Sequence, residues 1–407
     1  MSRQGKWRDP NDLSKFPWRR LKTTVAIFTA SRAEYGLLFP LIDALRKDPR
    51  TDVRVFVGGS HLTTESGRTI QEIQSDGVTV TDCFDYLLNH TDPVTLSRSL
   101  GIATMELARL FERYSFDWVC VLGDRYELLG IVSCAILFRK PILHIQGGEY
   151  TPAAIDEQIR HMVTKAAHLH CATCSTHCDN LRRMGESPWR IHNTGSLAID
   201  RIRCVPSMTR EQAFSELGLD PSRPTGIVTY HPVTLEMNIP IGDQIRHLLS
   251  AIRRFSLQWV VTAPNMDSGR EEIMNLILQT AMDNPDIHYV ESLGSRRYYG
   301  LIPHCEMVIG NSSSGLLEAP YFRIPTVNIG DRQAGRIRHR SILDTGYSQE
   351  SIAAGIQKAL SPEFREGLQT MEFQFGDGHA ASRMVEIIAG TKIDQNLMQK
   401  RMEACVG

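Results

Sequence analysis

The chain has 407 residues, of which 42% are hydrophobic and 22% charged, proportions typical of a globular enzyme with two or three domains. Its 45 Lys and Arg residues balance 46 Asp and Glu residues, so the formal net charge of −1 gives no electrostatic reason to expect nucleic acid or an anionic membrane as partner. The nine cysteines are scattered along the chain, residues 1–20 lack an apolar signal segment, and no apolar run approaches the ~18 residues of a membrane span. These features favour a cytoplasmic protein with reduced thiols.

Residues 1–20 are polar and charged and predict an irregular N-terminal arm. Beyond them, apolar and β-branched runs that end in glycine or polar residues predict buried strands. In the first half of the chain these strands are predicted at 23–29, 53–57, 119–122 and 141–145. A one-sided apolar stripe at 35–47 predicts a helix between the first two strands. Strands that alternate with helices indicate a parallel doubly wound sheet, with its chemistry at the carboxyl ends of the strands.

The pattern begins again after Gly195, where strands are predicted at 226–230, 259–263, 288–290, 307–309 and 326–329. We therefore predict an arm at 1–20, a first α/β domain at 21–195, a second at 196–376 and a C-terminal helical segment at 377–407. Two similar α/β domains imply a cleft between them, which is the usual place for a ligand.

The segment G-N-S-S-S-G at 310–315 directly follows a predicted strand and precedes a predicted helical stretch at 316–321. Its small residues let backbone N–H groups approach a ligand, its serines add hydroxyl donors, and the start of a helix favours an anion such as a diphosphate. Arg332, one strand later, could reach the same phosphates, because a guanidinium matches phosphate geometry. The alternatives are a serine helix cap and a surface ion pair.

A second candidate site begins at the strand end Gly147-Gly148-Glu149 and continues to Asp156, Arg160 and His161. Asp156 and Arg160 share a helical face as an i, i+4 pair. Glu149 and Asp156 could converge, and two carboxylates in different surroundings can divide the roles of acid and base. Helix capping with an exposed ion pair is the structural alternative.

Asp124 follows the strand at 119–122 and could act on a substrate hydroxyl, serve as a base, or cap a helix that begins near Arg125. The end of the first strand, at 29–35, lacks the G-x-G-x-x-G of a dinucleotide site. Three histidines and three cysteines crowd residues 168–178, but their spacing is not that of paired C-x-x-C zinc ligands. This segment also fits a strand followed by a helix, so we predict no metal site there.

Several of these segments together resemble one family. R-A-E-Y-G at 32–36 is similar to the R-A-D/E-Y motif of the UDP-N-acetylglucosamine 2-epimerase superfamily, and L-G-D-R-Y-E at 122–127 fits as well. The block at 144–170 resembles the hydrolysing branch, whose motif runs approximately H-x-x-G-G-E-x-T-x-G-x-x-D-E-x-I-R-H-x-x-T-K. The segments at 310–315 and 328–333, with Glu318, complete a consistent order over about residues 23–390.

The resemblance implies a glycosyltransferase-B-like α/β architecture of two Rossmann-like domains, with the nucleotide on the C-terminal domain and the sugar against the N-terminal one. It implies hydrolysis of a UDP-linked 2-acetamido sugar, such as UDP-N-acetylglucosamine or a 2,4-diacetamido analogue, through a 2-acetamidoglycal. The products are UDP and a manno-configured sugar for sialic-type acid biosynthesis. It implies neither a metal nor another cofactor, and a homodimer or homotetramer.

The resemblance also assigns roles to residues. The acid–base candidates are Asp124, Glu149 and Asp156, and Arg160 and His161 are expected to hold these carboxylates or the sugar. The residues expected to bind substrate or nucleotide are Arg32, Gln146, His231, Asn265, Ser312, Ser313, Ser314, Gly315, Glu318 and Arg332.

The chain departs from the family pattern in three places, one of which is the arm at 1–20, for which the family pattern has no counterpart. Gln146 stands where part of the family has a catalytic Glu, and glutamine cannot act as a general base. Pro152-Ala153 replaces an acid–glycine pair ahead of Asp156. The non-hydrolysing blocks H-V-E-A-G-L-R and H-R-R-E-N are replaced by other residues at 144–149 and 231–234, which favours hydrolysis. A non-hydrolysing epimerase, a glycosyltransferase of the same architecture and a nucleotide-sugar sensor stay open as alternatives.

Overall fold

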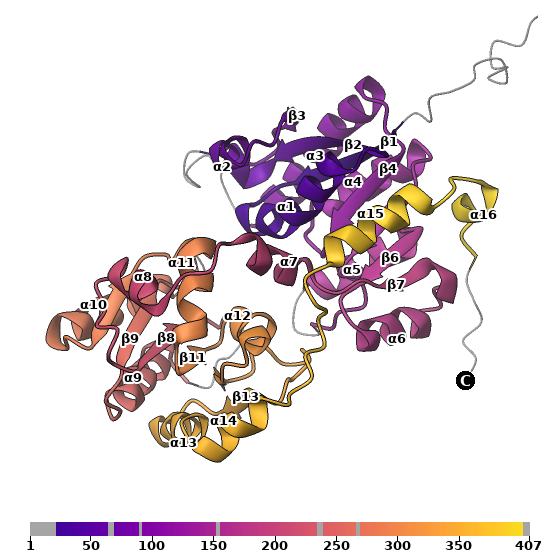
Figure 1. Cartoon of the computed structure of the whole chain (residues 1–407). Coiled ribbons are helices and arrows are strands. Elements are labelled where there is room, and N and C mark those ends of the chain that lie inside the picture. Colours follow the sequence, from indigo (N-terminus) through magenta and orange to yellow (C-terminus); the bar gives the residue numbers. More distant parts are fainter. Residues whose placement is uncertain are drawn as a thin grey trace, which may run out of the picture.

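The computed structural model describes residues 22–63, 69–88, 92–151, 155–233, 239–265 and 269–401. The predicted arm at 1–20 and the Pro152-Ala153 departure lie outside these ranges. The described residues form two α/β domains, each built around one parallel sheet, and this confirms the predicted fold class (Figure 1).

The first domain is a seven-stranded parallel sheet in the order β3-β2-β1-β4-β5-β6-β7. Its strands are β1 Thr23–Thr29, β2 Thr51–Gly58, β3 Val80–Phe84, β4 Trp118–Leu122, β5 Ile142–Ile145, β6 Leu169–Ala172 and β7 Ile191–Asn193. Its helices are α1 Arg32–Lys47, α2 Ile70–Ser75, α3 Pro93–Arg113, α4 Leu128–Leu137, α5 Ile155–Ala166, α6 Ser175–Arg183 and α7 Leu197–Cys204. The strand order reverses between β1 and β4, and doubly wound sheets bind ligands outside the carboxyl ends at such a point.

The second domain repeats this order in a six-stranded sheet, β10-β9-β8-β11-β12-β13. Its strands are β8 Thr225–Thr229, β9 Gln258–Thr262, β10 Ile287–Val290, β11 Met307–Gly310, β12 Thr326–Ile329 and β13 Ile342–Thr345. Its helices are α8 Arg210–Ser215, α9 Ile241–Ile252, α10 Arg270–Asp283, α11 Gly294–Leu301, α12 Ser314–Leu317, α13 Gln349–Ala359 and α14 Pro362–Leu368. Here the switch point lies between β8 and β11.

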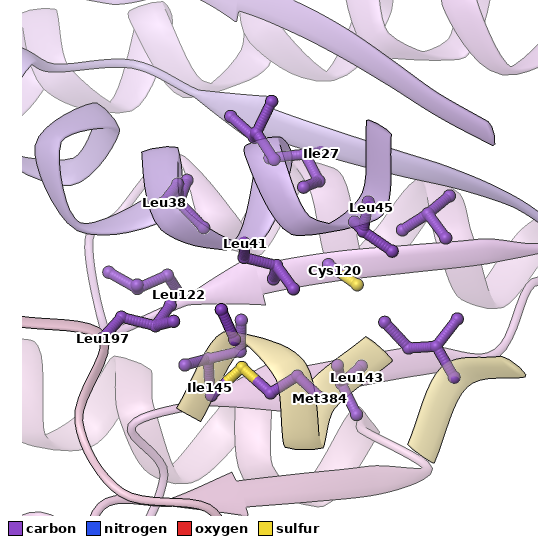
Figure 2. Packing of buried hydrophobic residues seen from close by; sticks show 14 of the residues in the cluster. Ile27, Leu38, Leu41, Leu45, Cys120, Leu122, Leu143, Ile145, Leu197 and Met384 are labelled. Carbon is purple, nitrogen blue, oxygen red and sulfur yellow. The ribbon is translucent and has the colours of Figure 1, made fainter. Parts of the chain in front are cut away.

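The core of the first domain depends on a helix that follows the second domain in sequence. After α14 the chain returns, and α15 (Ala380–Gly390) packs beside α1 and α7, followed by the short α16 (Gln395–Met398) (Figure 1). Figure 2 shows Leu38, Leu41 and Leu45 of α1 meeting Met384 of α15 over the strands. These side chains are fully buried, and each buried leucine contributes roughly 1.5–3 kcal/mol.

Two stretches of chain connect the domains, and they touch each other. Gly195 and Gly376 have φ angles of +88° and +90°, and the Phe375 carbonyl accepts from the Ser196 N–H at 2.9 Å. Close by, the Asp200 carboxylate accepts from the N–H groups of Ala380 and Ala381 at 3.0 and 2.8 Å. Asp200 therefore caps the start of α15 from 180 residues away in the sequence.

The sequence patterns do not predict β3, β7 and β13, and all three are edge strands. Edge strands are covered on fewer sides, and these three have mostly half-exposed side chains instead of a continuous apolar run. By contrast, β1 and β4 are buried along nearly their whole length and are found at the predicted positions.

Two predicted helices differ from the observed ones. The stretch at 316–321 is a single α-helical turn, α12, followed by a 3₁₀ turn at Ala319–Phe322, because Pro320 lacks the N–H that would continue the α pattern. The helix expected near Arg125 begins at Leu128 as α4, so Asp124 does not cap it. The C-terminal helix predicted after residue 377 is found as α15. Within the described ranges, every helix is too short or too polar to cross a membrane.

Candidate active site

The buried guanidinium of Arg160, from the second turn of α5, organises the carboxyl edge of the first sheet. It forms ion pairs with Asp124, which follows β4, and with its helical neighbour Glu157. It also donates to the Glu149 carbonyl at 2.9 Å and to the Thr151 hydroxyl at 2.9 Å. The predicted i, i+4 pair with Asp156 is replaced by this set of contacts, because Arg160 extends across to β4. Its side chain is only 3% exposed, so the guanidinium is held in one place.

Two predicted acid–base candidates sit around this guanidinium with raised pKa values. Burial raises the pKa of Glu149, against the lowering effect of Arg336 and Arg160. Burial also raises the pKa of Asp156, in the first turn of α5, and the negative charge of Asp124 adds to this rise. Carboxyl groups whose pKa values move toward neutrality can take and return protons at physiological pH. The structure therefore brings Asp124, Glu149 and Asp156 together within one electrostatic cluster.

Three other predicted residues lie around this cluster in different settings. His161 is half-exposed on α5 and contacts Glu157 at 3.1 Å, so it supports a carboxylate outside the predicted acid–base set. Arg32, at the start of α1, is 58% exposed and forms an ion pair with Glu72 of α2 at 3.0 Å. Gln146 follows β5 with a φ of +66°, which is uncommon for a residue with a side chain, and its N–H donates to the Cys171 carbonyl at 3.0 Å.

On the second sheet, the buried Asn311 joins the two strands at the switch point. Its Oδ1 accepts from the His231 N–H at 2.7 Å, and its Nδ2 donates to the His231 carbonyl at 2.9 Å. The Asn311 carbonyl accepts from Arg332 at 3.1 Å and from Gln333 at 2.8 Å. The His231 Nδ1 accepts from the Asn265 N–H at 3.1 Å. Asn311, to which motif reasoning gave no role, thus holds the predicted residues His231 and Arg332 directly. It holds the predicted Asn265 through His231.

The serine segment continues directly from Asn311. Ser312 and Ser313 are half-buried after β11, and Ser314, which begins α12, bonds through its hydroxyl to Tyr298. Gly315 packs so closely on Thr326 that an added Cβ would lie 2.7 Å from the Thr326 methyl carbon.

Glu318 follows the same turn. It accepts from the Tyr299 hydroxyl at 2.8 Å, and burial raises its pKa. The segment from Asn311 to Glu318 therefore offers N–H groups and hydroxyls beside Arg332, donors that suit a phosphate.

The two edges face one another. Arg336, from the loop between β12 and β13, lies near enough for its charge to lower the pKa values of Glu149 and His177 in the first domain. The His177 ring also stacks with Phe375 at 6.3 Å between ring centres. Arg336 of the second domain thus lies on the side of the first domain that carries Glu149 and His177.

The histidines at 168–178 have separate partners. His168 accepts from the Ile142 N–H at 3.1 Å, His170 bonds to Glu186 at 3.0 Å, and His177 bonds to the Thr173 hydroxyl at 2.6 Å. In the part of the chain that the structure describes, no three metal-ligating side chains gather into a candidate metal site. The segment is the predicted strand and helix, β6 and α6.

Sequence reasoning assigns no role to Glu157 and Asn311, although both lie in the candidate segments, and it misses Arg336. Glu157 stands next to Asp156 in the family block and Asn311 lies inside G-N-S-S-S-G, so position in a motif could have indicated both. Arg336 stands outside every motif considered, and only the arrangement of the domains brings its charge to Glu149.

The fold is that of a two-domain α/β protein, with carboxylates gathered at the carboxyl edge of one sheet and hydroxyl and guanidinium donors at the carboxyl edge of the other. The chain belongs to the UDP-N-acetylglucosamine 2-epimerase family, whose model matches residues 43–389.

Two curated relatives are each 32% identical to this chain. One is the GDP/UDP-N,N'-diacetylbacillosamine 2-epimerase (hydrolyzing) of Campylobacter jejuni, similar over 348 residues, or 85% of this chain and 89% of the relative. The other is the polysialic acid biosynthesis protein P7 of Escherichia coli, similar over 362 residues, or 88% of this chain and 92% of the relative.

Solved structures share the fold. A putative UDP-N-acetylglucosamine 2-epimerase from Listeria monocytogenes aligns with a TM-score of 0.74 at 18% identity, covering 90% of this chain and 96% of its own. The UDP-GlcNAc 2-epimerase from Neisseria meningitidis bound to UDP-GlcNAc aligns with a TM-score of 0.71 at 16% identity, covering 91% of this chain and all of its own. The predicted glycosyltransferase-B-like architecture is confirmed.

Proposed function

We propose that this protein hydrolyses a UDP-linked 2-acetamido sugar with inversion at C2, releasing UDP and the free manno-configured sugar. The observation that carries the proposal is the carboxylate cluster around Arg160, whose Glu149 also feels the charge of Arg336 from the second domain. Family membership supports this reaction, and two relatives named as hydrolysing 2-epimerases, one from C. jejuni and one from Legionella pneumophila, support hydrolysis over simple epimerisation.

The reaction divides into an elimination and an addition. One carboxylate of the set Asp124, Glu149 and Asp156 removes the C2 proton while the nucleoside diphosphate leaves C1, which gives a 2-acetamidoglycal. Water then adds across the double bond, with the new C2 proton delivered from the opposite face. The fixed position of Arg160 between Asp124 and Glu157 supports this scheme, because proton transfer requires acid and base to hold their places.

The C2 proton is only weakly acidic, so departure of the diphosphate has to drive the elimination. Ser312, Ser313 and Arg332 are proposed to stabilise the charge that develops on the leaving group. His231 and Asn265 are proposed to bind the substrate from the second domain, and Glu318 to accept from the ribose hydroxyls. Ser314 and Gly315 set the close turn on which these donors lie.

Gln146 is proposed to orient the sugar, since an amide cannot accept the C2 proton. If the natural substrate differs from UDP-N-acetylglucosamine, this position is one where the difference would be recognised. The names of the C. jejuni and L. pneumophila relatives, which are diacetylbacillosamine epimerases, support a 2,4-diacetamido sugar as the second candidate.

The test is product analysis in deuterated water with UDP-N-acetylglucosamine and with UDP- and GDP-linked 2,4-diacetamido sugars. We expect free nucleoside diphosphate and a free manno-configured sugar that carries deuterium at C2. A product still joined to UDP would indicate a non-hydrolysing epimerase. Release of UDP only with an acceptor, and with the original C2 configuration, would indicate a glycosyltransferase. Binding of these nucleotide sugars without turnover would indicate a sensor.

We also propose that the protein is a homodimer or homotetramer. Neighbouring helices α3, α4 and α5 expose Met105, Leu137 and Met162 at 67%, 79% and 58% on one side of the first domain. Exposed apolar side chains on neighbouring helices favour association. Light scattering coupled to size exclusion measures the mass, and a monomer at micromolar concentration would contradict the proposal.

A further inference from the structure

The C-terminal segment 394–400 is anchored to the first domain through the buried Arg190 and the partly buried Lys400. Arg190 donates to the carbonyls of Leu397 and Asn396 at 2.9 Å each, and also to the His168 carbonyl at 2.9 Å. Lys400 donates through its ammonium group to the carbonyls of Thr164, Lys165 and Ala167 at 2.7, 2.9 and 2.7 Å.

Lys400 is held by a buried acid as well. The fully buried Glu186 pairs with the Lys400 ammonium at 2.7 Å and bonds to His170 at 3.0 Å. Burial alone would raise the pKa of Glu186, but the bonds from His170 and Lys400 lower it to about 2. The acid is therefore ionised and fixes the ammonium group in place.

The carbonyls that Lys400 caps end the helix that carries the candidate acid–base cluster. Helix α5 has 12 residues, with Asp156 and Arg160 in its first two turns and Thr164 in its last. Carbonyls at a helix C-terminus have no partners within the helix, and a cation there is favourable. Lys400 supplies these partners roughly 18 Å from the start of α5, at 1.5 Å per residue.

A second connection runs from the same turn to Asp124. The Thr164 hydroxyl bonds to His144 Nδ1 at 3.3 Å, and His144 Nε2 bonds to the Gly123 carbonyl at 2.8 Å. Gly123 immediately precedes Asp124, the partner of Arg160. The end of α5 is thus tied to Lys400 through its backbone and to the end of β4 through a side chain.

We propose that Lys400 is a positioning residue for the active site, and that the docked segment 394–400 fixes α5 so that Asp156 and Arg160 stay aligned with Asp124. This inference rests on the proposed function, since it assigns Lys400 a role in that reaction. Lys400 contacts no substrate; it acts through a rigid helix, and displacing catalytic groups by about 1 Å can cost about a hundredfold in rate.

The test compares Lys400→Met with Lys400→Arg and with Lys392→Met, which changes an exposed lysine just ahead of this segment. We expect Lys400→Met to lower kcat by about tenfold or more. The Kd for UDP should stay within about twofold, because the proposed nucleotide site lies on the other domain. Lys400→Arg should recover most of the rate, and Lys392→Met should behave as the unsubstituted protein.

Amide hydrogen exchange separates positioning from simple stability and needs no substrate. Lys400→Met should speed exchange over residues 155–166 while the second domain stays unchanged. Thr164→Val breaks the hydrogen bond to His144 and should lower kcat in the same way. It replaces Lys400→Met in the test if that variant does not fold. Unchanged kcat and unchanged exchange in α5, or a lower Tm with normal kcat, would overturn the inference. Absence of turnover in the unsubstituted protein would overturn the proposed function instead, and the exchange result would still decide the role of Lys400 in holding α5.

Discussion

Asp156 is the residue at which the proposed chemistry can be tested most directly. Burial and the neighbouring Asp124 raise its pKa, as a proton acceptor near neutral pH requires. Asp156→Asn keeps the shape but removes the acceptor, so we expect kcat to fall by about 10² to 10⁴. The Kd for UDP should not change. Steady-state kinetics and calorimetry measure the two quantities.

His161→Gln is the matched control on the same helix. His161 is half-exposed and contacts Glu157, so its loss should reduce kcat far less than the Asp156 substitution. Normal turnover by Asp156→Asn would remove Asp156 from the acid–base set and leave Asp124 and Glu149 as candidates.

Glu34, in the R-A-E-Y-G segment, makes the stability of the fold depend on pH. It is buried and accepts from the Ala30 N–H at 2.7 Å, and burial raises its pKa from 4.5 to about 7, with Glu127 adding to the rise. The folded protein therefore holds this proton more tightly than the unfolded chain. Stability should fall as pH rises from about 4.5 to about 7, by at most roughly 3 kcal/mol at about 1.4 kcal/mol per pH unit.

Glu34→Gln should remove this dependence, because the amide oxygen can still accept from Ala30 and carries no charge. We expect the difference in Tm between variant and unsubstituted protein to be several degrees more positive at pH 8 than at pH 5. The exposed Glu112→Gln is the control and should show no such difference. Parallel Tm curves for Glu34→Gln and the unsubstituted protein would refute the assignment.

At the scale of single residues, the sequence predicts which side chains lie close together better than it predicts which of them form ion pairs. Asp124, Glu149, Asp156 and Arg160 are identified by their places in motifs, and the structure groups them. The partner predicted for Arg160, by helical spacing alone, is Asp156, yet the ion pairs form with Asp124 and Glu157. Helical spacing considers only the residues of one helix, whereas a long side chain can pair with any charge that the fold brings within reach.

Among the elements, the turn after β11 depends on Asn311. Asn311→Ala removes both bonds to the His231 backbone and leaves an N–H and a carbonyl without these partners. Each unsatisfied buried group costs about 1–3 kcal/mol, so we expect UDP binding to weaken by about tenfold or more as Ser312 and His231 lose their fixed positions. Calorimetric titration with UDP measures this.

Asn284→Ala is the control for that substitution, because Asn284 lies before β10, at the opposite edge of the same sheet. It should leave UDP affinity unchanged. If both variants bind UDP like the unsubstituted protein, the nucleotide does not depend on the Asn311 turn.

The sequence predicts best the strands that are buried on both faces along their whole length. Buried central strands such as β1 and β8 need apolar residues on both faces, and their runs are visible in the sequence. The edge strands β7 and β13 are short and half-exposed, so their residues resemble those of loops. The capping of α15 by Asp200 could not be predicted from the sequence either, because 180 residues separate the two partners.

At the scale of the whole molecule, the relation between the domains is set where the two connecting stretches touch. A Cβ added to Gly376 would lie 2.8 Å from the Gly195 Cα, and Gly376 has a φ of +90°. Gly376→Ala therefore meets both a clash with backbone and an unfavourable φ, which together should push the two stretches apart. The facing edges that carry Glu149 and Arg336 should shift with them.

We expect Gly376→Ala to lower kcat by about tenfold or more while the Kd for UDP changes little, because the proposed nucleotide site lies on one domain. Small-angle scattering should also show a changed radius of gyration. Gly101→Ala on α3 is the control, since its added Cβ meets no atom within 4 Å. If the two variants have the same kcat and the same radius of gyration, the glycine contact does not control how the domains face each other, and the alignment of the nucleotide with Asp124, Glu149 and Asp156 must be set by other contacts.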